Sequence, residues 1–300
     1  MLRSTPENAL DGLSTVLFPA DCRVCGNPLP GFSRLPVCEF CWKQLPPQSG
    51  ALCLCCGEAL GADPEAAVML DELLCRPCRL TDPPFRRAVA HGVYRGNLRA
   101  LLHLLKYQGL TPIADRLGVL LAERILAIPD LPQELVVMAV PLSRKKRLAR
   151  NFNQAELLAR AAIRVMRRRR PELKARLLTG VLGRQRSTES QAGLTPHQRR
   201  ANLRGAFFVS RKEAVAGREV LLIDDIYTTG ATARACSQAL RRAGVENVWV
   251  ATVARAQKEE TQRMLAEMDD AEDSAESEVA LWDNVPAAAG GQGSAGTGER

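Results

Sequence analysis

The chain has 300 residues, of which 46% are hydrophobic and 25% charged, as in globular rather than fibrous proteins. It contains no apolar run long enough to span a bilayer, and its N-terminal apolar stretch includes Asp11, which argues against a secretion signal. We therefore expect a cytoplasmic protein rather than an integral membrane protein or a secreted one.

The net charge of +8 is unevenly distributed along the chain. Residues 257–300 contain 11 acidic and three basic residues, so the rest of the chain carries +16. A basic body favours anionic partners, either nucleic acid or phosphorylated metabolites. From about residue 269 the composition is too poor in apolar residues to bury a core, which predicts a disordered tail over 269–300.

After a predicted amphipathic helix over 7–17, nine of the ten cysteines fall between residues 22 and 78. Two C-x-x-C pairs supply a tetrahedral sulfur shell for zinc, and a shell made only of protein ligands is structural. Disulfides or a redox-active pair are the alternatives, but a reducing cytosol and four such pairs favour metal. Consecutive pairs are the simplest partners, and interleaved pairs or a single site remain open. The pairs are Cys22/Cys25, Cys38/Cys41, Cys53/Cys56 and Cys75/Cys78.

From residue 83 the pattern changes to alternating strands and helices. Apolar runs predict strands, and apolar residues at helical spacing predict helices. This alternation predicts an α/β fold with a parallel sheet flanked by helices, which binds ligands at the carboxyl ends of its strands. The expected strands are 85–96 (strand or hairpin), 135–140, 176–182, 219–223 and 248–254, and the expected helices are 97–108, 112–127, 152–166 and 231–243.

The segment "VLLIDDIYTTGATARACSQAL" places two acids at the end of the fourth strand and a threonine-rich loop before a helix. A helix N-terminus with free N–H groups and hydroxyls suits a phosphate, while Asp224 and Asp225 suit ribose hydroxyls or Mg²⁺. A ribose 5-phosphate fits both. A P-loop ATPase would need a Gly-Lys dipeptide, which the chain lacks. Cys236, on the following helix, is expected in the core.

The stretch "LLIDDIYTTGAT" resembles the phosphoribosyl pyrophosphate (PRPP) signature of type I phosphoribosyltransferases. The cysteine pairs, "LLKYQG", "AVPLSRKKRLARNFNQAELLA" and "SQAGLTPHQRRANLRGAF" occur in the order seen in the ComF family of competence and DNA-utilisation proteins. The resemblance covers roughly residues 10–256. It implies an N-terminal helix and double zinc ribbon over 1–82 and a phosphoribosyltransferase-like domain over 83–268, followed by the tail.

The resemblance also implies roles for individual residues. The acid pair would hold the ribose hydroxyls, and the loop residues the 5-phosphate. Ser143 and Arg144 would lie nearest the pyrophosphate, and Lys106 would reach the ligand's anionic end. Residues 184–204 would form a mobile flap carrying Gln191, Arg199 and Asn202. If transfer occurs, Asp224, Asp225, Arg144 and Lys106 would carry it. The loop residues are Thr228, Thr229, Gly230, Ala231 and Thr232.

Two positions depart from the family pattern, which usually has histidine at Ser143 and glycine at Asn151. The resemblance implies a role in DNA uptake, with single-stranded DNA bound by a basic face that includes residues 144–150 and the flap. Residues 167–170 equally well form a solvated helix end. Because aromatic residues make up only 4% of the chain, DNA binding should be phosphate-dominated and salt-dependent. The alternative is a Mg²⁺-dependent phosphoribosyltransferase of nucleobase salvage, whose acceptor base the sequence does not identify.

Overall fold

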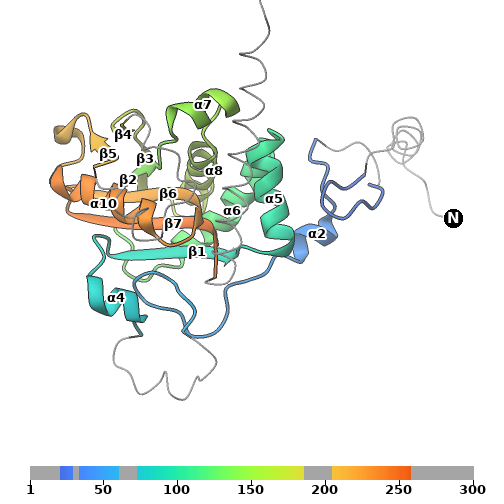
Figure 1. The fold of residues 1–300 in the computed structure, drawn as a ribbon, viewed down its shortest axis with the longest axis horizontal. Helices are drawn as coiled ribbons and strands as arrows, with labels where there is room; N and C mark the ends of the chain where they lie inside the picture. Colours follow the sequence, from blue (N-terminus) through green and yellow to red (C-terminus); the bar gives the residue numbers. More distant parts are fainter. Residues whose placement is uncertain (1–20, 30–33, 61–72, 186–204, 258–300) are drawn as a thin grey trace, which may run out of the picture.

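A computed structural model describes residues 21–29, 34–60, 73–185 and 205–257 (Figure 1). The predicted helix over 7–17, most of the predicted flap and the predicted tail lie outside the described residues. Within them, no helix is both long enough and apolar enough to cross a bilayer.

The centre of the fold is a five-stranded sheet in which every neighbouring pair of strands is parallel. This confirms the predicted fold class. The strand order β1-β7-β6-β2-β3 puts β6 in the middle, so both of its edges pair with a neighbouring strand. The strands are β1 (Arg87–Val93), β2 (Glu134–Ala139), β3 (Lys174–Leu177), β6 (Glu219–Tyr227) and β7 (Asn247–Arg255).

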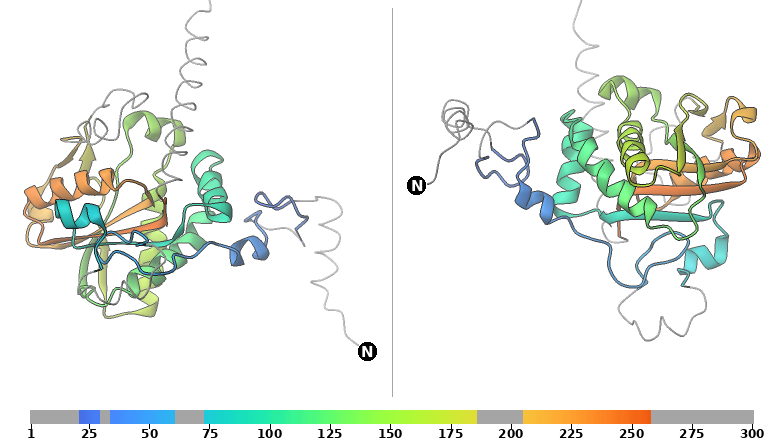
Figure 2. Two further views of the ribbon diagram at one scale, coloured as in Figure 1. Left: turned by 60° about the horizontal axis from the view of Figure 1, so that its bottom comes forward. Right: turned by 180° about the vertical axis from the view of Figure 1, so that it is seen from behind.

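Helices cover both faces of this sheet (Figure 2). The alternating side chains of β6 divide between two cores: Leu221 and Ile223 pack on one side, Val220 and Leu222 on the other. The first core contains residues of α5 (Gly96–Tyr107), α6 (Ile113–Leu126) and α8 (Gln154–Arg169). The second contains residues of α10 (Ala231–Arg242).

The strand predicted over 176–182 is instead divided between two sheets. Gly180 has a φ of +73°, a left-handed conformation that ends the extended chain after β3. The chain then forms β4 (Leu182–Arg184), which pairs antiparallel with β5 (Phe207–Val209), and the 3₁₀ turn η1 (Lys212–Ala214) follows. Arg184, expected at the start of the flap, therefore belongs to a strand.

The segment expected to be a pyrophosphate loop forms a short helix, α7 (Arg144–Arg150). Ser143 caps this helix, because its hydroxyl accepts the N–H of Lys146 at 3.4 Å. Asn151 ends the helix at a φ of +59°. Asparagine is one of the few residues that adopt this conformation at low cost, which explains how it replaces the family's usual glycine.

Within its described residues, the cysteine-rich segment contains two short helices, α2 (Glu39–Lys43) and α4 (Arg76–Thr81), each beginning directly after a cysteine. The part around α2 packs with α5, and the part around α4 packs on the α10 side of the sheet. In Figure 1 these two parts lie at different ends of β1.

Candidate functional site

Eight cysteines form two clusters of four, and the sulfur atoms of each cluster lie within 4.8 Å of one another. The consecutive pairs come together, as the simplest of the predicted arrangements requires. We call them the first cluster (Cys22, Cys25, Cys38 and Cys41) and the second cluster (Cys53, Cys56, Cys75 and Cys78).

Both clusters fit zinc. The backbone N–H of Cys38 donates to Cys22 Sγ at 3.3 Å, and the N–H of Cys56 donates to Cys53 Sγ at 3.5 Å, bonds that favour thiolates. Gly57 directly follows Cys56, the end of the first C-x-x-C pair of the second cluster, and has a φ of +69°. Since protein sulfurs fill all four positions of a tetrahedral shell, the metal would organise the fold and leave no position for a substrate.

The acid pair lies within β6 rather than beyond it, because the strand continues to Tyr227. Asp224 stands opposite Thr252 of the neighbouring strand. Successive side chains of a strand point to opposite faces. Asp224 accordingly lines a cavity beside α10, while Asp225 meets Lys106 of α5.

Asp225 is held by a buried cation. Its Oδ2 lies 2.8 Å from Nζ of Lys106, and the two side chains are 7% and 11% exposed. Burial is the largest single influence on the pKa of Asp225 and would raise it. The charge and hydrogen bond of Lys106, the charge of Arg150 and a hydrogen bond from Gln154 together outweigh burial and lower this pKa. Burial would likewise lower the pKa of Lys106, yet Asp225 raises it. Asp225 is therefore a fixed negative charge.

Asp224 behaves differently. Burial and the charge of Asp225 raise its pKa well above the usual value, although the N–H of Asp225 donates to its Oδ1 at 2.9 Å. The two adjacent acids thus have opposite tendencies. One is ionised and paired within the protein, and the other would gain most from a ligand that donates hydrogen bonds to it.

The threonine-rich loop adjoins Asp224. Thr228, Gly230 and Thr232 line the same cavity of about 20 Å³, which is room for roughly one water molecule. A sugar phosphate would therefore lie over the mouth of this cavity. Gly230 opens α10 at a φ of +74°, and a Cβ there would overlap the Tyr227 hydroxyl, so the loop requires glycine.

Thr229 caps the start of α10, since its hydroxyl accepts the N–H of Ala231 at 3.3 Å. Cys236, one turn further along, is fully buried in the α10 core, as predicted. The N-terminus of α10 thus combines backbone N–H groups with threonine hydroxyls.

Some predicted site residues occupy other positions. Arg144 is exposed, and within the described residues no contact joins it or Ser143 to the acid pair. Lys106 forms an ion pair with Asp225, and its predicted contact with a ligand's anionic end stays a prediction. Sequence reasoning missed Arg150 and Gln154, which act on Asp225; their only sequence signal is the "RNFNQ" stretch after the basic run.

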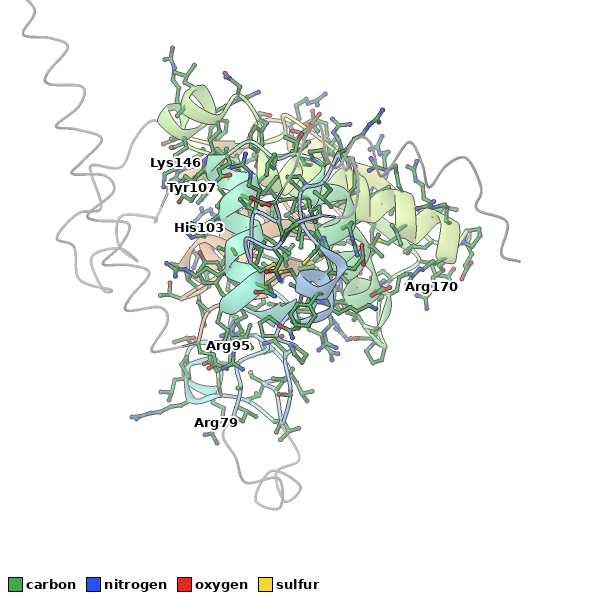
Figure 3. The ribbon with its side chains drawn as sticks, turned by 90° about the vertical axis from the view of Figure 1, so that its right-hand side faces the viewer. Arg79, Arg95, His103, Tyr107, Lys146 and Arg170 are labelled. Carbon is green, nitrogen blue, oxygen red and sulfur yellow. The ribbon has the colours of Figure 1, made fainter. Side chains whose placement is uncertain are left out.

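One edge of the molecule, the α5 edge, combines cations with an exposed ring. Tyr107 is 63% exposed, with the Arg150 guanidinium 5.0 Å from its ring centre and the His103 ring 5.2 Å away. Figure 3 shows His103, Tyr107 and Lys146 along this edge, with Arg95 further along it. We define the α5 edge by these five residues.

The basic run 167–170 lies elsewhere, at the C-terminus of α8, and Arg170 is well apart from the α5 edge in Figure 3. Arg167 donates to the carbonyl of Ala175 at 2.9 Å, and Arg169 pairs with Glu123 at 2.8 Å. These contacts support the reading of this run as a helix end.

Comparisons with known proteins agree with both parts of this arrangement. Residues 13–79 match the double zinc ribbon domain, and residues 153–282 match the phosphoribosyl transferase domain. The DNA utilization protein YhgH of Salmonella typhi is 30% identical over 235 residues, which cover 77% of this chain and 95% of that protein. The chain belongs to the ComF family.

Other relatives carry competence in their names. Competence protein F of Haemophilus influenzae is 31% identical over 229 residues, covering 73% of this chain and 90% of the relative. Competence protein ComFC of Bacillus subtilis is 25% identical over 215 residues, covering 69% and 79%. Family membership therefore joins a phosphoribosyltransferase-like domain to DNA utilisation.

Proposed function

We propose that this ComF protein binds PRPP at the acid pair and the threonine-rich loop and acts in DNA uptake or utilisation, holding single-stranded DNA on the α5 edge. The observation that carries the proposal is that Asp224, Thr228, Gly230 and Thr232 surround one cavity at the start of a helix. We further propose a cytoplasmic location, because thiolate zinc shells persist in a reducing compartment.

The two halves of the site match the two ends of a ribose phosphate. Ribose hydroxyls would donate to the carboxylates, and a bound donor would lower the raised pKa of Asp224. The 5-phosphate would accept from the N-terminal N–H groups of α10 and from the threonine hydroxyls. The positive charge of Lys106 compensates the negative charge of Asp225. Both carboxylates can therefore be ionised with less repulsion between them.

Magnesium would arrive with the pyrophosphate. Carboxylate oxygens are the ligands this cation prefers, and Asp224 is the carboxylate of the pair that forms no ion pair with a lysine within the described residues. When bound, Mg²⁺ would neutralise part of the pyrophosphate charge. Arg150, whose charge already acts on Asp225, is the cation of α7 that we assign to this end of the ligand.

The α5 edge supports the DNA part of the proposal. An exposed ring between cations can stack one base while the cations meet phosphates. Tyr107 has this setting, with Arg150 on its face. A single ring gives little sequence preference, so binding would depend mainly on phosphate contacts and on salt.

The DNA proposal is tested by fluorescence anisotropy with a labelled single-stranded oligonucleotide at several salt concentrations. Tyr107→Ala should weaken binding by about fivefold or more, since one stacked base contributes ~1–3 kcal/mol, and Tyr107→Phe should not. Arg170→Ala, on the separate basic run, is the control for net charge. Equal losses in Tyr107→Ala and Arg170→Ala would refute the α5 edge as the DNA surface.

The second candidate function is phosphoribosyl transfer to a nitrogenous base. The observation that favours it is the raised pKa of Asp224, because a carboxyl that exchanges its proton readily can take one from an attacking nitrogen. The test is to incubate the protein with Mg²⁺, PRPP and a panel of nucleobases and to measure pyrophosphate release. This distinguishes transfer from binding alone. Turnover that is lost in Asp224→Asn would support transfer with Asp224 as the proton acceptor, and PRPP binding without turnover would leave the binding proposal.

A further inference from the structure

The carboxyl end of β7 connects the second cluster to the threonine-rich loop, residues 228–232. Arg255, the last residue of this strand, is only 5% exposed. Its Nη1 donates to the carbonyl of Cys56 at 2.6 Å, and its Nη2 pairs with the Glu58 carboxylate. A charge this deeply buried is stable only while these partners stay in place.

The same guanidinium stacks on the last residue of β6. The Arg255 side chain lies over the Tyr227 ring, 4.4 Å from its centre. The backbone repeats this connection, because the N–H of Ala256 donates to the carbonyl of Tyr227 at 2.9 Å. A second ring, that of Phe85, meets Tyr227 edge-on with ring centres 6.5 Å apart. Tyr227 is therefore fixed from two sides.

Tyr227 in turn supports the threonine-rich loop. Its hydroxyl lies so close beneath Gly230 that no side chain could replace the glycine hydrogen. These contacts form a continuous series. Cys56 and Glu58 bind Arg255, Arg255 packs on the Tyr227 ring, and that ring lies against Gly230.

We propose that Arg255 is a positioning residue that transmits the zinc-ordered fold of the second cluster to residues 228–232. Glu58 and the Cys56 carbonyl reach Arg255 only when the segment around the second cluster is folded, and a segment of this size folds around its metal. The zinc therefore orders a loop that it does not touch. The inference depends on the proposed function only for the identity of the ligand that the loop binds.

The test is amide hydrogen exchange of peptides covering residues 226–235, measured on the full-length zinc-loaded protein without ligand. Arg255→Met should raise exchange in these peptides by about tenfold or more, the scale of losing one desolvated cation–π contact, with both zinc ions retained. The control is Arg86→Met, since Arg86 also stacks on an aromatic ring, that of Trp249, 5.5 Å from its centre and toward the other end of β7. That variant should leave the loop unchanged.

A second variant keeps the inference testable if Arg255→Met does not fold. Tyr227→Leu retains the partners of Arg255 in the second cluster but removes the ring beneath Gly230. It should raise hydrogen exchange in the same peptides while zinc content stays at the wild-type value. In the double variant, exchange in these peptides should be no faster than in either single variant, because both substitutions interrupt the same series of contacts.

Loop exchange unchanged in Tyr227→Leu, or effects that add in the double variant, would overturn the inference. A lower melting temperature without faster loop exchange would also overturn it, because Arg255 would then be merely structural. Failure of the wild-type protein to bind PRPP is a separate result: it contradicts the proposed function, while the exchange measurement still decides the role of Arg255.

Discussion

The two cysteine clusters have the same ligands but different surroundings. The first cluster contains an exposed cysteine, Cys25, and docks through the carbonyl of Cys41, which accepts from Asn97 Nδ2 at 3.1 Å. Arg116 of α6 adds a stack over Trp42, with 4.3 Å to the ring centre. These contacts reach the first turn of α5 and the exterior of α6.

All four residues of the second cluster are buried, and its contacts reach the ligand site. The carbonyl of Cys55, between two of its ligands, accepts the N–H of Ala88 in β1 at 2.6 Å. Arg234 of α10 donates to Thr81 of α4 at 3.0 Å, and Arg255 joins the cluster to β7. The difference indicates that the first cluster anchors an attached segment, whereas the contacts of the second cluster lead to β7 and α10, which flank the proposed site.

The largest expected effect separates the two clusters directly. Cys56→Ser should release one zinc ion, lower the free energy of unfolding by more than about 4 kcal/mol and weaken PRPP binding. Cys25→Ser should release the other zinc ion but leave PRPP affinity within about twofold, as expected for distant sites. Metal analysis, urea unfolding and calorimetry measure the three quantities. Equal losses of affinity in the two variants would end the distinction between the clusters.

Lys106→Met tests how much the ion pair between α5 and Asp225 contributes to stability. Lys106 lies in the last turn of the helix whose first turn meets the first cluster. Removing it leaves Asp225 charged and buried, which should cost about 3–5 kcal/mol of unfolding free energy. In the double variant Lys106→Met/Asp225→Asn, urea unfolding should show much of this stability restored. No recovery in the double variant would show that the ion pair does not account for the loss.

Asp224→Asn should change the free energy of unfolding in the opposite direction, because it should stabilise the protein. Because the folded-state pKa of Asp224 is raised, its contribution to stability is fully present below the unfolded pKa and is lost as pH rises through the folded pKa. Asparagine cannot ionise, so the variant should be more stable at neutral pH by about 1 kcal/mol, typical of relieving a functional site. The gain should shrink toward pH 4. Urea unfolding at both pH values measures it, and a pH-independent difference would contradict the assignment.

The smallest expected effect belongs to the docking of the first cluster. Arg116→Ala removes the stack over Trp42 and an exposed ion pair with Glu39, which together should cost about 1 kcal/mol. PRPP affinity, measured by calorimetry, should not change. A clear loss of affinity would mean that the first cluster also reaches the site.

The sequence predicts those parts of this molecule in which local pattern and spacing determine structure. The cysteine pairs and the apolar strand of β6 are of this kind, because C-x-x-C knuckles and buried strands leave short-range signals. The acids at a strand end and the threonines before a helix identified the candidate loop, and the family resemblance identified PRPP as its expected ligand. The division of residues 176–182 between two sheets depends on the conformation of Gly180, for which the sequence offers only a glycine.

The partners of the site residues could not be predicted in the same way. Lys106 and Asp225 are separated by more than a hundred positions, and Arg255 and Cys56 by 199. Nothing in either segment identifies the other. The opposite tendencies of Asp224 and Asp225 follow from these long-range contacts and from the two faces of one strand, so adjacent identical residues receive different environments.

Calorimetric titration of the zinc-loaded protein with Mg²⁺-PRPP tests the central claim most directly. We predict saturable binding to one site per chain in the wild type. Asp224→Asn and Thr232→Val, which alter the two sides of the cavity, should each weaken it by about tenfold or more, the loss expected for hydrogen bonds to charged groups. A folded, zinc-loaded wild type that gives no binding heat, or binding that both substitutions leave unchanged, would contradict the account.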